Sequence, residues 1–432
     1  MSFAHEADRR GLFRVFSGIT AKGSGRLYIY SLLFTMSLSP SVPRSWDRPG
    51  SLSLGIPLYV YACVASSLCI VVGLLWDISW HITIGRDGLF SAPHNLIYAG
   101  AAFAGLFAGY RCLMASFGPH KAERPHLVHF WGIFYSSLGG LFCIWGSIAA
   151  LTSAPFDDWW HSTYGLDVEI FTPPHTVLIL GLMTIQLGAM FLVMALLNRE
   201  DDAVFPERTA RLRLLFTLTA GFLLAMLYLF VSEFVDRVNS HNAIYYQVSG
   251  LVFPLFLFST ARASGHRWGA TRISLVYMLV LLLTNWVLQQ FPAEPLLGPI
   301  LNPVTHFQFF GFPVLLILPA ACIDWLQQRV IFRNNWTRAF AMALVFALVY
   351  GLIQWFFGEF LVSSPLARNK FFGSYTWYFG NDPNWEYRYQ YYPWAREAAG
   401  DLATGLGIAF LITLLSTRVG LAWGNWMKKV VR

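Results

Sequence analysis

Residues 76–94 read WDISWHITIGRDGLFSAPH, and a related stretch at 156–175 reads FDDWWHSTYGLDVEIFTPPH. Each stretch has an Asp followed four residues later by a His, and a Pro-His pair that ends thirteen or fourteen residues after that His. Apolar segments long enough to cross a bilayer flank both stretches. The chain is therefore organised around two related Asp-x-x-x-His…Pro-His units, each placed between two membrane spans.

Composition places the chain in a membrane. Of its 432 residues 56% are hydrophobic and 12% are charged, with mean hydropathy +0.50, and a soluble protein carries about twice that share of charge. We predict an all-α, polytopic membrane helical bundle of about ten transmembrane helices. The expected spans are 57–76, 93–113, 129–152, 174–197, 213–233, 244–261, 272–290, 304–323, 338–361 and 400–423.

The distribution of Lys and Arg predicts the orientation. Basic residues concentrate in alternate connections and in the C-terminal tail, at 111–124, 199–213, 262–272, 329–338 and 428–432. Because positively charged loops stay in the cytoplasm, we expect both termini inside, in a bacterial-type inner (plasma) membrane, and both Asp/His units at the outer face. The net charge of +7 reflects this bias and does not indicate nucleic-acid binding.

Three segments follow from this reading. Residues 1–56 are expected to form a cytoplasmic amphipathic segment and linker. Residues 57–198 form a four-helix membrane unit that carries both Asp/His motifs. Residues 199–432 form a six-helix membrane unit with a long outer loop at 362–399. The aromatic content of this loop indicates a folded lid or docking surface, or an interfacial aromatic belt.

The spacing of the first motif predicts a metal site. An Asp and a His four residues apart on a helix share a face, so Asp77 and His81 can approach a common point. The intervening Gly85 and Pro93 prevent a continuous helix, and Pro93 suits the first turn of the next span. His94 then faces the first pair across a hairpin. Three Asp/His ligands with an open position are what catalytic metal sites need.

The second motif repeats this arrangement with Asp157, His161 and His175. Imidazole and carboxylate ligands suit copper, zinc, iron or nickel. A single His at a membrane interface is more often a hydrogen-bonded packing residue, but a repeated constellation favours metal binding. Paired histidines at this spacing also occur in bis-haem cytochromes, where both lie on one unbroken helix. Here Gly, Asp and Pro interrupt each segment, which favours a metal ion over haem.

The motif residues resemble a known family. Asp77–Asp87 followed by Ser91–His94 resembles the copper-ligand segment of the membrane C subunit of particulate methane and ammonia monooxygenases. The segment Asp157–His161, followed by Phe171–His175, is similar to that subunit's second metal segment. The similarity covers about residues 57–198 and is specific in its motifs. The family commonly has Asn where Asp157 stands, and a carboxylate there would bind copper more tightly or favour a harder metal, with zinc as the alternative at one site.

The resemblance implies a copper-dependent membrane monooxygenase, or a subunit of one. Asp77, His81 and His94 match its first copper triad, and Asp157, His161 and His175 match its second. Such an enzyme activates dioxygen to hydroxylate a small apolar substrate, such as a short hydrocarbon or ammonia. The implied partners are the lipid bilayer, an electron donor, a separate cupredoxin-bearing subunit and further copies in an oligomer.

Two other hypotheses stay open at this point. One is a membrane protein that binds or passes copper or zinc without oxygenase chemistry. The other is a structural or assembly subunit whose histidines brace helix ends. In the second half of the chain, further polar residues are candidates for cavity lining, proton relay or simple solvation of the interface: Glu233, Asp236, His241, Tyr245, Tyr246, Asn302, Pro303, His306 and Glu359.

Overall fold

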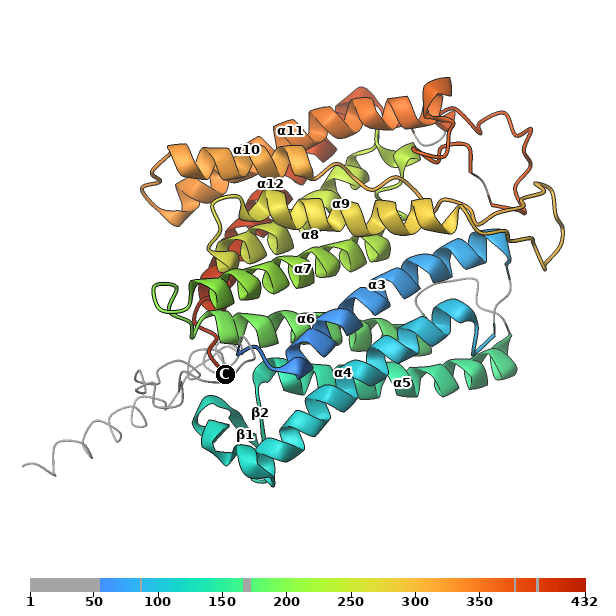
Figure 1. Cartoon of the computed structure of the whole chain (residues 1–432). Coiled ribbons are helices and arrows are strands. Elements are labelled where there is room, and N and C mark those ends of the chain that lie inside the picture. The colour runs from blue at the N-terminus through green and yellow to red at the C-terminus, as the bar shows by residue number, and fades with distance from the viewer. Residues whose placement is uncertain (1–54, 86–87, 166–171, 377, 394–395) are drawn as a thin grey trace, which may run out of the picture. The chain divides into compact units, whose positions relative to one another are not determined.

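The computed structural model describes residues 55–85, 88–165, 172–376, 378–393 and 396–432. The chain from Leu52 onward forms one unit, and its helices run side by side (Figure 1). The expected amphipathic segment at the N-terminus lies almost wholly outside the described residues.

Within the described residues, nine helices are long and apolar enough to cross a membrane. Each coincides with one of the ten expected spans, which confirms the polytopic helical bundle and a multi-pass membrane protein; its orientation stays a prediction. The helices are α3 (Leu58–Thr83), α4 (Ala92–Ser116), α5 (Leu138–Tyr164), α6 (Pro173–Leu197), α7 (Pro206–Val231), α8 (Ala243–Ser264), α9 (Gly269–Leu288), α11 (Asn335–Ser363) and α12 (Ala399–Met427).

The remaining expected span, 304–323, differs from the prediction. Residues 307–316 have no regular secondary structure, and the short helix α10 (Ile317–Arg329) follows them. Non-helical backbone at membrane depth is stable only where protein groups satisfy its hydrogen bonds, and here other helices supply them. Three backbone N–H groups of this stretch donate to side-chain oxygens: Gln308 to Thr83, Phe310 to Asn285 and Leu315 to Gln354.

Short elements connect the helices. The 3₁₀ helix η1 (Pro119–His126) and an antiparallel pair of strands, β1 (Val128–Phe130) and β2 (Phe134–Ser136), join α4 to α5. In the pair, Val128 lies opposite Ser136. The 3₁₀ helix η2 (Arg237–Asn239) precedes α8, and η3 (Pro365–Ala367) follows α11.

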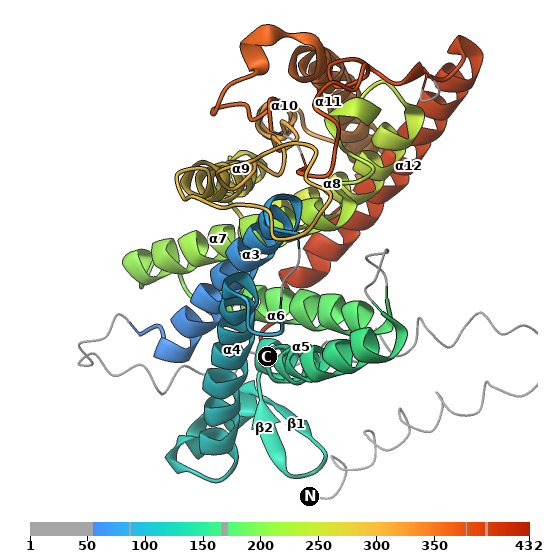
Figure 2. The same cartoon turned by 90° about the vertical axis from the view of Figure 1, so that its right-hand side faces the viewer.

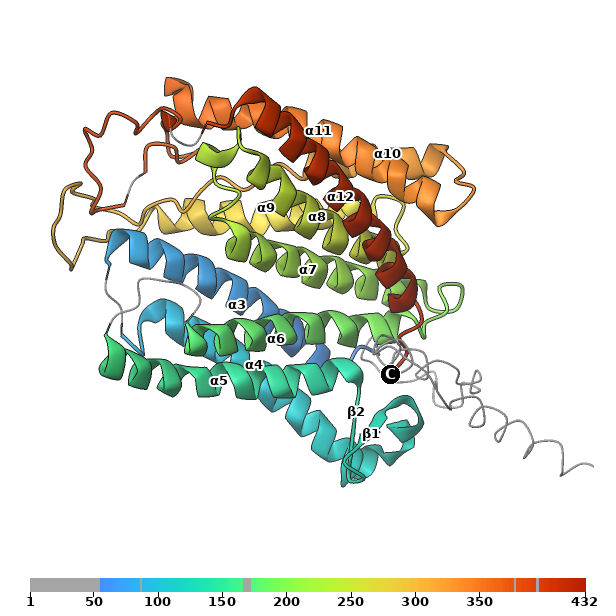
Figure 3. The ribbon, with the colours of Figure 1, turned by 180° about the vertical axis from the view of Figure 1, so that it is seen from behind.

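Small residues bring α5 and α6 into close contact. A Cβ atom at Gly146 would lie 2.6 Å from the carbonyl oxygen of Gly181, and one at Gly188 would lie 2.8 Å from the backbone nitrogen of Cys143. Without a hydrophobic driving force in lipid, such small-residue seams let helix backbones pack directly. Figure 3 shows the two helices side by side. The seam fixes the pair of helices that carry the second Asp/His motif.

Helix α3 packs against both halves of the chain, because it contacts α4 and α6 as well as α7 and α9. A buried polar pair joins it to α6: Ser67 donates its hydroxyl to the side-chain oxygen of Gln186, and Gln186 donates to the backbone oxygen of Ser67 at 2.9 Å. Buried polar groups are costly unless they are paired in this way. The position of α3, and so of the first Asp/His motif at its end, is therefore well defined.

Candidate metal centres

The first motif converges on the carboxylate of Asp77. Asp77 and His81 lie in the last two turns of α3, and His94 lies in the first turn of α4, where Pro93 occupies the predicted position. One carboxylate oxygen, Oδ1, is 3.2 Å from His94 Nε2, and the other, Oδ2, is 3.9 Å from His81 Nε2. Asp77 therefore lies near both imidazoles, but within the described residues the three ligand atoms of this triad do not all come within 4.8 Å of one another.

The second motif forms a similar but tighter arrangement between α5 and α6. Asp157 Oδ2 lies 3.4 Å from His161 Nε2, and Asp157 Oδ1 lies 3.4 Å from His175 Nε2. One potential ligand atom from each of the three residues lies within 4.8 Å of the others. Thr172 caps α6, and its hydroxyl accepts a hydrogen bond from the backbone N–H of His175. The cap and the Pro-Pro pair that follows it set the start of α6, and with it the position of His175.

Backbone carbonyls orient three of the four imidazoles. In each, the Nδ1–H group donates to the carbonyl oxygen of a glycine, so Nε2 is the ring nitrogen that faces the carboxylate. This is the tautomer that metal-binding histidines adopt, with the second ring nitrogen held by a backbone or carboxylate oxygen. The three pairs, each at 3.1 Å, are His81 with Gly85, His94 with Gly88 and His161 with Gly165.

In the neutral form of this tautomer, the imidazole Nε2 and the carboxylate oxygen that it faces are both hydrogen-bond acceptors. A neutral imidazole whose Nδ1 carries the proton presents a lone pair at Nε2, and an ionised carboxylate presents only lone pairs. The Oδ1 atom of Asp77 is buried and accepts no hydrogen bond within the described residues, although His94 Nε2 is 3.2 Å away. Such a cluster is stable when a proton or a metal cation lies between the acceptors. The donor set, two imidazole nitrogens and a carboxylate, fits copper or zinc.

Loops from the second half of the chain pack against the end of α3, next to the first centre. The backbone N–H of Leu296 donates to the carbonyl of Ile84 at 2.9 Å, and that of Phe379 donates to the carbonyl of Ile82 at 3.4 Å. Phe379 is 2% exposed, and its ring packs on Gly85 so closely that a Cβ atom there would lie 2.8 Å from the ring. Figure 2 looks onto this end of the molecule and shows the loop that follows α9 crossing the end of α3.

The two centres differ in this covering. Gly165, the counterpart of Gly85, has nearly the same φ, +93° against +94°. Among the described residues, nothing lies within 4 Å of the Cβ position at Gly165. Phe379 thus packs on Gly85, the glycine beside the first centre, whereas Gly165 beside the second centre has no such contact among the described residues.

An apolar shell adjoins the first centre. Phe307 and Leu288 are buried together with Ile84, and Trp76 and Trp80 pack against them. These groups come from α3, α9 and the stretch before α10, and sequence reasoning missed Phe307 and Phe379 as neighbours of the motif. The only signal for Phe379 was the aromatic content of the 362–399 loop, which did not indicate where the loop would pack.

Two of the other polar candidates, His241 and Glu359, lie close together at another place, whereas Asn302 and His306 lie in the loop between α9 and α10. His241 is stacked between the rings of Trp355 and Tyr391, with centroids 4.0 and 4.2 Å away, and its Nε2 atom is 3.9 Å from Glu359. Burial lowers the pKa of His241, against the raising effects of the Trp355 carbonyl and Glu359. The ring contacts indicate that His241 is a packing residue of the α8–α11 end.

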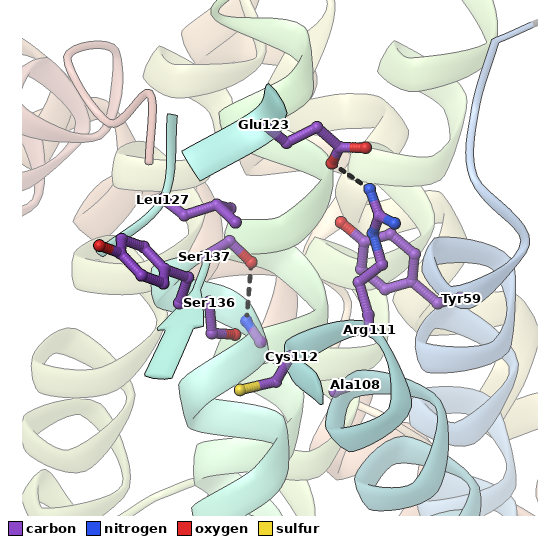
Figure 4. Close-up of a pocket in the computed structure, with 10 residues that line it drawn as sticks. Tyr59, Ala108, Arg111, Cys112, Glu123, Leu127, Ser136 and Ser137 are labelled. Atoms are coloured by element: carbon purple, nitrogen blue, oxygen red, sulfur yellow. Dashed lines mark hydrogen bonds and ion pairs between the residues drawn. The ribbon is translucent and has the colours of Figure 1, made fainter. Parts of the chain in front are cut away.

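A shallow pocket lies beside the C-terminal half of α4 (Figure 4). Arg111 and Glu123 form an ion pair at its edge, and Tyr59 and Cys112 line it. Arg111 follows His94 by seventeen residues, about 25 Å of helix rise. The pocket is therefore separate from the metal centres.

Comparison of the chain with protein-family models, with characterised proteins and with solved structures finds no match.

Proposed function

We propose that the chain is a copper-dependent membrane monooxygenase, or the metal-bearing membrane subunit of one, acting on a small apolar substrate such as a short hydrocarbon or ammonia. The observation that supports the proposal is the pair of Asp/His/His triads, each with imidazole Nε2 atoms directed at a carboxylate. Bound copper would supply one-electron chemistry with dioxygen. The motif resemblance to particulate monooxygenases supplies the reaction class.

The residues of each triad have distinct roles in this proposal. Asp77 and Asp157 offset the charge of a bound cation, and the histidines supply the nitrogen ligands. The glycine carbonyls hold the imidazole rings in the ligating tautomer before the metal arrives, so less reorganisation accompanies binding.

The apolar shell of the first centre suits an apolar substrate. Trp76, Trp80 and Phe307 belong to an apolar cluster at the end of α3, and an apolar wall with few polar groups is typical of sites for small apolar ligands. A substrate dissolved in the bilayer can reach such a wall without crossing water. The reaction also needs two electrons from outside the chain, and we assign these to a quinol or a redox partner.

Copper content and electron paramagnetic resonance test this proposal. The full chain, purified after expression with copper, is compared with His81→Ala, His161→Ala and the double variant. We expect each single variant to lose the signal of one centre and the double variant to lose both. His129→Ala, which removes a histidine from the β1 strand away from both triads, is the matched control. A parent protein without copper above background would refute the proposal.

Ligand exposure favours one alternative, a protein that binds and passes a metal ion without oxygenase chemistry. The His81 side chain is 48% exposed, and those of His161 and His175 are 27% and 32% exposed. Open ligands of this kind exchange cations readily. Oxygen-dependent product formation from short alkanes, alkenes or ammonia distinguishes the two functions, because a metal carrier forms none.

A further inference from the structure

A second charged site lies at the end of the bundle opposite the metal centres. Here α8 ends, α11 begins and α12 ends, and each contributes one cation to what we call the basic cluster: Arg262, Arg338 and Lys428. The cluster falls in the connections whose Lys and Arg content predicts the cytoplasmic face. It shares no residue with the metal triads and does not depend on the function proposed above.

Close helix packing holds the cluster together. A Cβ atom at Gly424 would lie 2.7 Å from Arg262 Cβ, so the arginine lies directly on α12. Arg262 Nε then donates to the side-chain oxygen of Asn425 at 2.9 Å. Lys428 follows Asn425 by three residues and so lies one turn further along the same face.

The three cations repel one another. The pKa of Lys428 is lowered, first by partial desolvation and then by the charges of Arg262 and Arg338. Among the described residues, no Asp or Glu forms an ion pair with any of the three. A carboxylate at the same end, that of Asp324, does not pair with the cluster; it accepts hydrogen bonds from the backbone N–H and the hydroxyl of Thr271, both at 2.8 Å.

Arg338 has unused hydrogen-bonding capacity. Its guanidinium lies 5.5 Å from the ring centroid of Phe332, and its Nε atom is buried with no hydrogen-bond partner among the described residues. A buried donor without an acceptor is unfavourable. Arg338 is also the fourth residue of α11, where the partial positive charge of the helix start adds to its own. The cluster thus combines uncompensated positive charge with an unsatisfied donor.

We propose that Arg262, Arg338 and Lys428 bind a phosphate oxyanion, of the kind carried by an anionic phospholipid headgroup or by free phosphate. Guanidinium groups match phosphate oxygens in geometry, and Lys adds a point charge. Basic pockets between the cytoplasmic ends of transmembrane helices bind lipid headgroups in this way. The same helices carry the exposed apolar side chains Trp336, Phe340 and Val419, which offer contact to acyl chains.

Lipid titration of the full chain tests the site. The purified protein in neutral detergent is titrated with phosphatidylglycerol, with phosphatidylcholine and with inorganic phosphate, and retained lipid is measured by native mass spectrometry together with the thermal midpoint. We expect phosphatidylglycerol, but not phosphatidylcholine, to be retained and to raise the midpoint. Arg338→Gln or Lys428→Gln should each weaken retention about five-fold. Inorganic phosphate that stabilises the parent and loses its effect in the same variants would identify free phosphate as the occupant.

Matched variants separate a built site from general attraction to a negative surface. Arg211→Gln and Arg329→Gln remove exposed cations from the same predicted face, and they should leave retention unchanged. Equal weakening by these controls, or parental retention in Arg338→Gln and Lys428→Gln, would overturn the proposal. Lys428 lies beyond the last residue of α12, so its variant tests the site even if Arg262→Gln fails to fold.

Discussion

Replacing Phe379 with Ala should weaken the first metal centre and spare the second. The ring is almost fully buried and packs on Gly85, whose carbonyl holds His81 in its ligating tautomer. Truncating a buried Phe costs about 3–5 kcal/mol of stability. The backbone hydrogen bonds of Phe379 to Ile82, Leu301 and Asn302 do not need the ring, so we expect the loop to remain attached while Gly85 loses its packing.

The consequence for the metal follows from the role of the carbonyl. Loss of a group that orients a metal-binding histidine lowers metal affinity about 10–100-fold. Titration with Cu²⁺ or Co²⁺, followed by absorption or paramagnetic resonance, measures this in a background where His161→Ala and His175→Ala remove the second centre. The reciprocal background, with His81→Ala and His94→Ala, reports the second centre, which Phe379→Ala should leave within two-fold of the parent, or about 0.4 kcal/mol.

The two glycines provide a matched pair for the same reasoning. Ala at Gly85 or Gly165 adopts the same positive φ, and strain of this kind costs about 1–3 kcal/mol at either position. Only Gly85→Ala also drives a Cβ atom against Phe379. It should therefore be the more damaging change, and Phe379→Ala should partly rescue it in a double-mutant cycle. Equal effects at the two glycines without rescue, or equal loss at both centres in Phe379→Ala, would refute the reasoning.

Three further predictions concern other parts of the molecule. Burial lowers the pKa of His241 below its unfolded value of about 6.5, so folding favours the neutral imidazole. The contribution of His241 to stability is therefore complete above that pH and is lost as the pH falls toward the folded pKa. Between pH 7.5 and 5.0, the thermal midpoint of the parent should fall more than that of His241→Phe. Gly146→Leu forces a side chain against the backbone of α6 and should lower the free energy of unfolding by about 1–3 kcal/mol or more. Metal should be lost from the second centre before the first, which is measured by titrating each centre separately. A copper chelator should lower the thermal midpoint of the metal-loaded parent, because a ligand that binds the folded state stabilises it, and should leave the midpoint of the His81→Ala/His161→Ala variant unchanged.

The approach of each aspartate to its two histidines was predictable because the spacing of these residues is local. A spacing of four residues on a helix and a proline in the first turn of the next helix are properties of the chain itself, so Asp77, His81 and His94 could be placed together without tertiary information. The same holds for Asp157, His161 and His175. What the spacing could not indicate was the glycine carbonyls that orient the rings, because their positions depend on how each helix ends.

The stretch before α10 was not predictable in the same way. Hydropathy reports the side chains of residues 304–323, whereas the shape of this segment depends on where its backbone hydrogen bonds go. Those bonds reach Thr83, Asn285 and Gln354, which are remote in sequence. Prolines in this segment weaken a helical conformation, but only hydrogen bonds from the neighbouring helices stabilise its non-helical backbone. The packing of Phe379 on Gly85 is equally remote and gave no signal in the sequence.

The stretch before α10, residues 307–316, also constrains the order in which the protein is assembled. A segment whose backbone is satisfied by three other helices cannot enter the bilayer as an independent unit, so it must settle only after α3, α9 and α11 are present to receive it. The loops that pack at the end of α3 lie next to that segment and beyond α11, so they are synthesised late. The second centre needs only α5 and α6, both made in the first half of the chain. During biogenesis the two centres should therefore become competent to load metal at different times, the later-numbered motif first.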